Sequence, residues 1–376
     1  MTTARLRLLA ADLDYPDDLA LHTAASGRVP ALAARYLEIR REDGFHGVGE
    51  VRANVAYLTG LDEATATAAI GILCERVDWS VPAEDLLAAF DAVADGAPAT
   101  ARAVVESAIL DGLARMRGVP VAALLGGDFV PALSSNQCLF WGPQERFETL
   151  ARRYLDEGFR EIKVRIAIAD FDQDLARLRR LREICGPKVH VAADANASWG
   201  AEEAARKLGA LAEFDLAYVE QPTTKGDWVA FDHVLARAPM PLMLDENLAT
   251  ADDLERLLDR AGRGSGPMGH LKIAKMGSPR AVTDAARRLK AAGIGVMIGQ
   301  MNEGAMATAI TAHCAMAARP DHAELYGCYG LLNDPAAGLA YRDGALIAPE
   351  GPGLALTFDA GACRELWSRE VAAPTG

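Results

Sequence analysis

Three carboxylates stand at the ends of apolar segments at nearly constant spacing. Asp194 ends the run in VAADANASW, Glu220 the run in YVEQPTTKG and Asp245 the run in LMLDENLAT, at intervals of 26 and 25 residues. A lone acid in such a place is more often a helix cap or a surface charge. Three of them at the ends of successive buried strands would repel one another unless a cation bound between them. Because an all-oxygen ligand set favours a hard ion over zinc, the sequence predicts a Mg²⁺ site.

A repeated strand–helix unit surrounds these acids from about residue 134 onward. Short apolar segments such as EIKVRI, VHVAADAN and HLKIAKMG alternate, up to eight times, with amphipathic segments such as DQDLARLRRLREICG. A doubly wound open sheet would show the same alternation, but we find no glycine-rich nucleotide turn after its first strand. The number of units favours a closed parallel barrel, whose functional residues lie at the C-terminal ends of the strands. The three acids would then converge on one point.

The first 130 residues do not show this strand–helix repeat. RYLEIRREDGFHGVGE predicts a β-hairpin with a turn at Asp43-Gly44, and alanine-rich helical segments follow. The predicted fold is therefore α/β: a modified TIM-like (β/α) barrel with an N-terminal α+β capping domain. We predict a cap with substrate-closing loops over residues 1–130, a barrel with the metal and catalytic site over residues 131–345, and a C-terminal segment that packs back on the cap over residues 346–376.

Composition and charge limit the partners. The net charge of −13 argues against nucleic acid or an anionic membrane surface, because both need clustered Lys and Arg. The first residues carry acids where a signal peptide has an apolar region, and no run of about 20 uncharged apolar residues occurs, so we expect a cytoplasmic protein without a membrane span. The six cysteines form no C-x-x-C pair and are expected to be reduced.

Several motifs, in this order and spacing, resemble the enolase superfamily in its mandelate racemase and muconate lactonising enzyme branches: DGFHGVGE, DAN with SW, VEQP, LDEN, LKIAKMG and GQMNEGA. The resemblance extends over nearly the whole chain. It implies that Asp194, Glu220 and Asp245 bind Mg²⁺ and that Asn196 and Glu246 orient them. It also implies a small-molecule carboxylate as substrate and a homo-oligomer as the assembly.

The implied chemistry is removal of a proton next to a carboxylate. The product is an enediolate whose charge Mg²⁺ would offset, and its formation needs a nearby base. Lys272, in HLKIAKMG, is the predicted base, because burial in an apolar strand and a neighbouring cation would both lower its pKa. Lys275 would face elsewhere on the same strand, so we expect it to be structural.

The second strand of the predicted barrel departs from the family pattern. The family usually carries Lys-x-Lys there, the second lysine being an acid/base, whereas EIKVRI has Lys163 and then Arg165. Arginine keeps its proton, so we predict that both residues bind substrate carboxylate and stabilise the enediolate while Lys272 works alone. This favours one-base chemistry, either dehydration by a lyase or cycloisomerisation. Two alternatives stay open: a racemase or epimerase with an unexpected second acid, and a catalytically silent relative that binds metal and carboxylate.

Other polar residues are candidates for the substrate cavity. Glu303, in QMNEG, matches the family's acid near the substrate carboxylate, where it would share a proton. Tyr329, in YGCYGLL, is predicted to line the eighth strand; that stretch lacks the Asp-x-Asp of dipeptide epimerases, which argues against dipeptides. Arg52, Asn54 and Tyr57, in GEVRANVAYLTG, are predicted on a cap loop that reaches the substrate, with Arg52 suited to a second anionic group.

Overall fold

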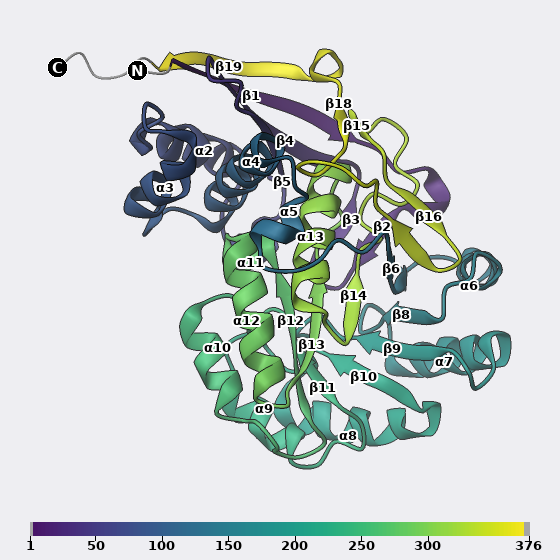
Figure 1. The fold of residues 1–376 in the computed structure, drawn as a ribbon. Helices are drawn as coiled ribbons and strands as arrows, with labels where there is room; N and C mark the ends of the chain where they lie inside the picture. Colours follow the sequence, from purple (N-terminus) through teal and green to yellow (C-terminus); the bar gives the residue numbers. More distant parts are fainter. Residues whose placement is uncertain (1–2, 372–376) are drawn as a thin grey trace.

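The computed structural model describes residues 3–371, and Figure 1 shows a sheet-and-helix cap above a barrel. Eight strands form one parallel sheet in strict chain order. The amide of Asn136 donates to the carbonyl of Ala323 at 2.9 Å and joins the first strand to the last. The sequential order excludes the doubly wound alternative and confirms the predicted barrel. The strands are β7 (Gln137–Leu139), β8 (Glu161–Arg165), β9 (His190–Asp194), β10 (Leu216–Glu220), β11 (Leu242–Leu244), β12 (Pro267–Lys272), β13 (Gly295–Gly299) and β14 (His322–Glu324).

Helices follow the strands, and capping residues explain where several of them begin. The Ser278 hydroxyl accepts from the amide of Ala281 ahead of α12, whose first residue is Pro279. Thr250 and Asp253 form a reciprocal capping box at the start of α10. The barrel helices are α6 (Gln144–Asp156), α7 (Phe171–Cys185), α8 (Ala201–Leu211), α9 (Trp228–Leu235), α10 (Ala251–Leu258), α11 (Ile273–Met276), α12 (Pro279–Ala291) and α13 (Ala305–Ala318). No helix within residues 3–371 is long and apolar enough to cross a membrane.

The cap is a four-stranded sheet with helices packed on it, and its strand order is β19 (Arg364–Val371), β1 (Ala4–Leu13), β4 (Leu32–Arg41) and β5 (His46–Arg52). The predicted hairpin is β4 (Leu32–Arg41) and β5 (His46–Arg52), and Gly44 has the positive φ of +88° that its turn requires. The remaining cap elements are α1 (Ala56–Thr59), α2 (Glu63–Arg76), α3 (Leu86–Ala94) and α4 (Ala99–Arg117). A short two-stranded hairpin, β2 (Leu21–Thr23) and β3 (Gly27–Val29), reaches from the cap toward the barrel.

The C-terminal part of the chain returns to the cap. Strand β19 (Arg364–Val371) pairs antiparallel with β1. Strand β17 (Ala345–Ile347) pairs with β6 (Ala132–Ser134), so the predicted boundary after residue 345 falls inside a strand, and the domain limits stay predictions. The remaining short elements are α5 (Val121–Leu124), β15 (Ala336–Ala337), β16 (Ala340–Arg342) and β18 (Thr357–Phe358).

Close approach of β5 to α4 depends on glycine. A Cβ added at Gly49 would lie 2.2 Å from the carbonyl oxygen of Val104 and 2.8 Å from the amide nitrogen of Ala108, both backbone atoms of α4. Gly49→Ala is therefore expected to lower the free energy of unfolding by about 1–3 kcal/mol, measured by urea denaturation. Gly209→Ala, in α8 with no atom within 4 Å of the added Cβ, should instead be neutral or stabilising. Equal effects of the two substitutions would contradict this account.

Candidate active site

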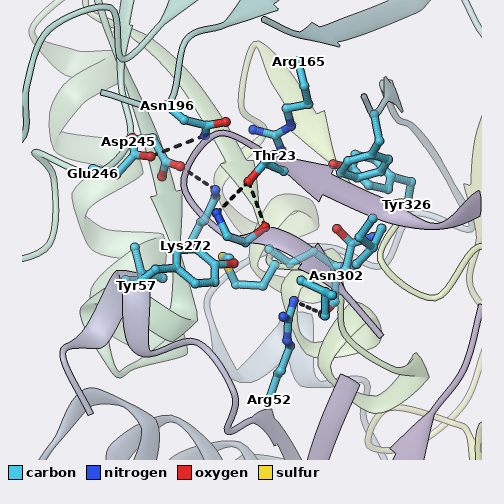
Figure 2. A pocket seen from close by; sticks show the side chains of 17 residues that line it. Thr23, Arg52, Tyr57, Arg165, Asn196, Asp245, Glu246, Lys272, Asn302 and Tyr326 are labelled. Carbon is cyan, nitrogen blue, oxygen red and sulfur yellow. Dashed lines mark hydrogen bonds and ion pairs between the residues drawn. The ribbon is translucent and has the colours of Figure 1, made fainter. Parts of the chain in front are cut away.

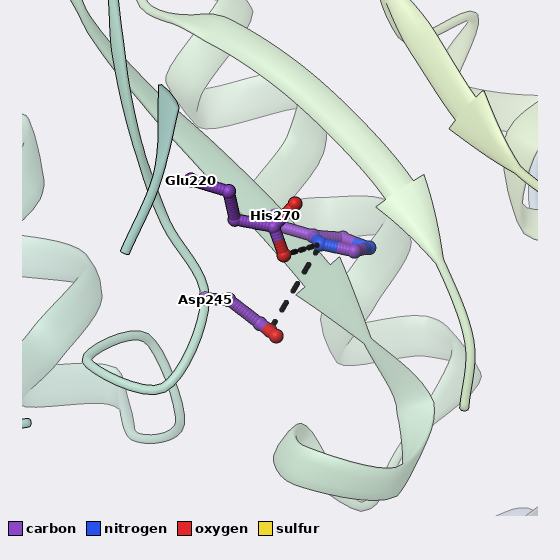
Figure 3. A group of neighbouring side chains, drawn as sticks. All are labelled: Glu220, Asp245 and His270. Atoms are coloured by element: carbon purple, nitrogen blue, oxygen red, sulfur yellow. Dashed lines mark hydrogen bonds and ion pairs between the residues drawn. The ribbon is translucent and has the colours of Figure 1, made fainter. Parts of the chain in front are cut away.

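The three acids lie side by side at the C-terminal ends of adjacent strands. Asp194 ends β9, Glu220 ends β10 directly opposite it in the ladder, and Asp245 follows β11. All three side chains are buried. Ligand atoms of Glu220, Asp245 and His270 lie within 4.8 Å of one another, whereas Asp194 lies outside that group (Figure 3). The predicted convergence is therefore closest for Glu220 and Asp245.

Each of these acids also contacts a basic side chain. Arg165 pairs with Asp194, the Lys163 Nζ lies 2.8 Å from the Glu220 Oε2, and the Lys272 Nζ lies 2.7 Å from the Asp245 Oδ2. Burial raises the pKa of Asp245, but Lys272, Lys275 and His270 outweigh it and hold that pKa well below its usual value. Ionised, buried carboxylates on adjacent strands are a donor set that fits a hard divalent cation. A bound cation and these basic groups would compete for the same oxygens.

His270 is a site residue that the sequence reasoning missed. Its Nδ1 lies 2.9 Å from the Glu220 Oε1, and the ring is fully buried. Burial, aided by Lys272, lowers the pKa of His270 to about 4, so the ring is neutral near pH 7 and Nδ1–H can donate to Glu220. Such a contact fixes the carboxylate's orientation. The spacing in the sequence could have identified it: His270 stands two residues before Lys272 on the same strand, and residues two apart on a strand point to the same side.

Lys272 and Lys275 both reach Asp245, which corrects the expectation for the second lysine. Strand β12 ends at Lys272, and Lys275 lies on the helical turn α11, so strand alternation does not govern where Lys275 points. Its Nζ donates to the Asp245 Oδ1 at 2.6 Å and to the carbonyl of His270 at 2.7 Å. Burial lowers the pKa of Lys272, but Asp245, Glu324 and Glu220 raise it more, and the net pKa is above its ordinary value. The surrounding carboxylates therefore raise the pKa of Lys272, whereas burial alone would lower it.

The two basic residues of β8 occupy different places. The Lys163 Nζ pairs with both Glu220 and Glu324 and is fully buried beneath the site. Arg165 lines the cavity, and its Nε donates to the Cys138 Sγ at 3.2 Å. The structure therefore brings Arg165 to the cavity surface and leaves Lys163 behind it, holding Glu220 in place.

Asn196 and Glu246 lie beside the acids, as expected. The Asn196 amide donates to the Asp194 Oδ1 at 2.8 Å, and its Nδ2 lies 3.4 Å from the Glu246 Oε1. Burial, and then Asp245, raises the pKa of Glu246 to about 7. Gln221, the glutamine of VEQP, was not singled out, yet its Oε1 accepts from the amides of Asp245 and Asn247 at 3.0 and 3.2 Å. It ties the end of β10 to the loop that carries Asp245.

A narrow cavity opens above these residues, between the barrel and the cap (Figure 2). Arg52 and Tyr57 line it, as predicted, together with Lys272 and Arg165. The other lining residues are Leu21, Thr23, Ser26, Val29, Leu58, Phe140, Asn196, Asp245, Glu246, Gln300, Met301, Asn302 and Tyr326.

Three predicted cavity residues lie elsewhere. The Asn54 Oδ1 accepts from the Arg52 Nε at 2.7 Å and from the amide of Ala33 at 3.1 Å, so Asn54 holds Arg52 from behind. The Tyr329 hydroxyl donates to the Glu157 Oε2 at 2.6 Å, away from the cavity that Tyr326 lines. Glu303 accepts from the amide of Met301 at 3.1 Å and is absent from the cavity wall.

Comparison with known proteins identifies the family to which this chain belongs. Residues 146–362 match the family described as Enolase C-terminal domain-like. Over 361 residues the chain is 30% identical to muconate cycloisomerase 1 from Pseudomonas putida, covering 92% of each sequence. The chain belongs to the enolase superfamily. It is an enzyme of the mandelate racemase and muconate lactonising enzyme type, a group of isomerases and lyases.

Other relatives include enzymes of a different reaction. The chain is 27% identical over 261 residues to the L-Ala-D/L-Glu epimerase of Bacillus subtilis, covering 68% of this chain and 70% of the relative. The crystal structure of muconate lactonizing enzyme from Pseudomonas fluorescens, complexed with muconolactone, superimposes with a TM-score of 0.87 at 27% identity, covering 96% of this chain and 98% of that chain. Members of the superfamily use Mg²⁺.

One further contact joins the cap of this superfamily enzyme to its barrel. Glu50, the last residue of DGFHGVGE, accepts from the amides of Gly304 and Ala307 at 2.6 and 3.0 Å, at the start of α13. Asp334 accepts from the neighbouring amide of Ala305 at 2.6 Å. Burial, together with Asp334, raises the pKa of Glu50 well above its usual value. The loop before α13 forms the Gln300–Asn302 wall of the cavity, so Glu50 helps to fix that wall.

Glu50→Ala is expected to lower the free energy of unfolding by about 2–4 kcal/mol, because two buried backbone N–H groups lose their acceptor. Urea denaturation at pH 7 measures the effect. Glu84→Ala, at an exposed position of the cap, should change stability by less than about 0.5 kcal/mol. A Glu50→Ala protein that unfolds at the wild-type urea concentration would show that the carboxylate does not hold the helix.

Proposed function

We propose that this chain is a Mg²⁺-dependent enzyme that removes the α-proton of a small carboxylate with a single base, Lys272, and that its reaction is a cycloisomerisation of the muconate type. Asp194, Glu220 and Asp245 are the proposed metal ligands. When bound, Mg²⁺ would offset the negative charge that builds up on the substrate carboxylate. The observation that carries the proposal is that Lys272 lines the cavity within 2.7 Å of Asp245, while the corresponding cation across the cavity is an arginine.

In the proposed reaction each of these side chains has a separate role. In the direction of lactone formation the protonated Lys272 Nζ gives its proton to the α-carbon, the electron pair of the C=C bond forms the new C–H bond, and the second carboxylate of muconate closes the ring C–O bond. In the reverse direction the neutral Nζ that results takes the α-proton of muconolactone, the electron pair of the C–H bond forms the C=C bond, and the ring C–O bond breaks to release that carboxylate. Arg165 remains a cation on the opposite wall and pairs with a substrate carboxylate. Arg52 supplies a second cation from the cap. Glu303 lies behind the Met301–Asn302 wall, so we assign it to the shape of that wall rather than to contact with substrate.

The relationship to dipeptide epimerases supplies a second candidate function. An epimerase needs a proton carrier on each face of the α-carbon. Arg165 keeps its proton: burial lowers its pKa, but Cys138, Tyr326 and nearby acids raise it more, and the net pKa is well above its ordinary value. The arginine therefore favours one-base chemistry over epimerisation. A cytoplasmic location and a homo-oligomeric assembly stay predictions.

Incubation with Mg²⁺ and muconolactone in D₂O tests the proposal. We expect ¹H NMR to show exchange of only one of the two α-hydrogens, with absorbance of muconate appearing in parallel. Exchange with inversion of an L-Ala-L-Glu dipeptide would support the epimerase instead. Binding of muconolactone without exchange or muconate formation would indicate a catalytically silent relative.

A further inference from the structure

The β2–β3 hairpin separates two cavities. In its register Leu21 pairs with Val29, His22 with Arg28 and Thr23 with Gly27. Successive side chains of a strand point to opposite faces. Accordingly, Leu21, Thr23 and Val29 line the catalytic cavity, whereas His22 and Arg28 line a second cavity on the outer side of the hairpin. Leu21 contributes to both cavities, so the two spaces adjoin.

The outer cavity has a volume of about 430 Å³ and carries charge of one sign. It lies between the hairpin and the segment that leads into α6, and its lining residues are Ala20, Leu21, His22, Arg28, Trp141, Gly142, Pro143 and Arg146. Two arginines and a histidine stand among them and no acid, in a chain whose net charge is −13. The positive charge that the two arginines concentrate here is unfavourable without a counter-ion and raises the local concentration of anions.

The basic groups of the outer cavity have no carboxylate partner within residues 3–371. Arg146 donates to the carbonyls of Trp141 and Asp17 at 2.6 and 3.2 Å, which hold the guanidinium in place without neutralising it. Neither Arg28 nor His22 makes an ion pair in the described part of the chain. The guanidinium of Arg177, 5% exposed, lies 4.5 Å from the ring centroid of Trp141 and adds positive charge behind the indole. The arrangement fits a small oxyanion, which accepts several charge-assisted hydrogen bonds.

The hairpin is also the part of the site that must move. The catalytic cavity beneath it has only about 40 Å³ of free volume, far less than an organic acid requires. The two strands of the hairpin are hydrogen-bonded to each other and, within residues 3–371, to no other strand. In the described part of the chain, one backbone hydrogen bond, from the amide of Trp141 to the carbonyl of His22 at 3.2 Å, ties the hairpin to the barrel. Entry of substrate therefore requires a displacement of His22 and Arg28 relative to Arg146.

We propose that the outer cavity is a binding site for a small oxyanion with two negative charges, which bridges His22 and Arg28 of the hairpin to Arg146 of the barrel and holds the hairpin closed. An anion that contacts both sides binds the closed arrangement better than an open one, and it shifts the population by that difference in affinity. By linkage, a substrate that needs the closed hairpin must raise the affinity for the anion by the same factor.

Calorimetric titration of the Mg²⁺-loaded enzyme with sulfate, at constant ionic strength set by NaCl, tests the site without reference to turnover. Arg28→Gln and Arg146→Gln are each expected to weaken sulfate binding about tenfold or more. Arg179→Gln, which removes an exposed arginine of α7, should leave it unchanged. Because Arg28 is exposed and Arg146 contacts the fold, Arg28→Gln is the decisive variant. Undetectable binding to the wild type, or unchanged affinity in Arg28→Gln, would overturn the proposal.

Proteolysis of the hairpin turn tests the coupling to closure. Elastase cleavage after the exposed Ala24 in the hairpin turn, followed by mass spectrometry, should slow several-fold in the wild type when sulfate is added. The same addition should not change the cleavage rate of Arg28→Gln. Equal protection of both proteins would mean that sulfate acts elsewhere, and no protection of the wild type would show that the anion does not hold the hairpin.

Discussion

Replacing Lys272 with arginine is expected to slow exchange of the α-hydrogen of muconolactone by at least about 10³-fold. Arginine retains the positive charge beside Asp245 but keeps its proton, so the change removes the base without leaving Asp245 unpaired. Lys272→Ala should be equally inactive and also less stable, because it leaves a buried carboxylate with one cation fewer. Exchange followed by NMR in D₂O separates proton removal from later steps.

The control for this prediction is Lys188→Arg, an exposed lysine, which should exchange at the wild-type rate. Circular dichroism and the thermal midpoint of Lys272→Arg should match the wild type, so that lost activity is not lost structure. An active Lys272→Arg enzyme would show that Lys272 does not transfer the proton. His270 and Lys275 would then be the candidate bases.

The barrel was predictable because its local signals agree with one another. Apolar strand segments of three to six residues, amphipathic helices and residues such as Thr250 and Ser278 at helix starts all point to the same alternation. The β4–β5 hairpin was equally clear from its turn. The short hairpin over the cavity was not, because its three-residue strands stand outside the repeating strand–helix pattern that identifies equally short barrel strands such as β11.

The strand-end acids and Lys272 were predictable because each ends a strongly apolar run. Residues whose position depends on an irregular turn were not. Lys275 was expected on a strand, but α11 begins at Ile273 and rotates it onto Asp245. Tyr329 was expected in the cavity, but Tyr326 lines it instead. The segment after β14 has no periodic pattern from which the inward-facing tyrosine could be identified.

The ion pairs of the site bear directly on its proposed metal. Lys163, Arg165 and Lys272 satisfy the three strand-end acids in this structure, so the buried charge is already compensated. A divalent cation must displace these contacts to bind, and its affinity is reduced by their strength. Arg165 and Lys272 reach their acids from an adjacent strand, whereas Lys163 reaches Glu220 across the intervening strand β9.

Magnesium is expected to stabilise the protein as well as activate it, and Glu220→Gln should abolish both effects. A ligand that binds only the folded state at about 100 times its dissociation constant adds about 2.7 kcal/mol to the free energy of unfolding. Addition of Mg²⁺ to the chelator-treated protein should therefore raise the thermal midpoint and restore exchange. Glutamine still accepts from His270 and keeps the shape of the side chain, but it lacks the charge that a hard cation requires.

Glu161→Gln provides the matched control for this prediction. Glu161 begins β8 at the opposite end of the barrel, where it contacts His322 and Tyr218, so its charge cannot reach the strand-end acids. Its variant should keep the full Mg²⁺-dependent shift of the thermal midpoint. If Glu220→Gln kept the same shift, Glu220 would not be a ligand, and its pairing with Lys163 and His270 would be its whole role. If neither protein shifted, the carboxylates would be satisfied by their basic neighbours alone, and the chemistry assigned to the metal would have no site.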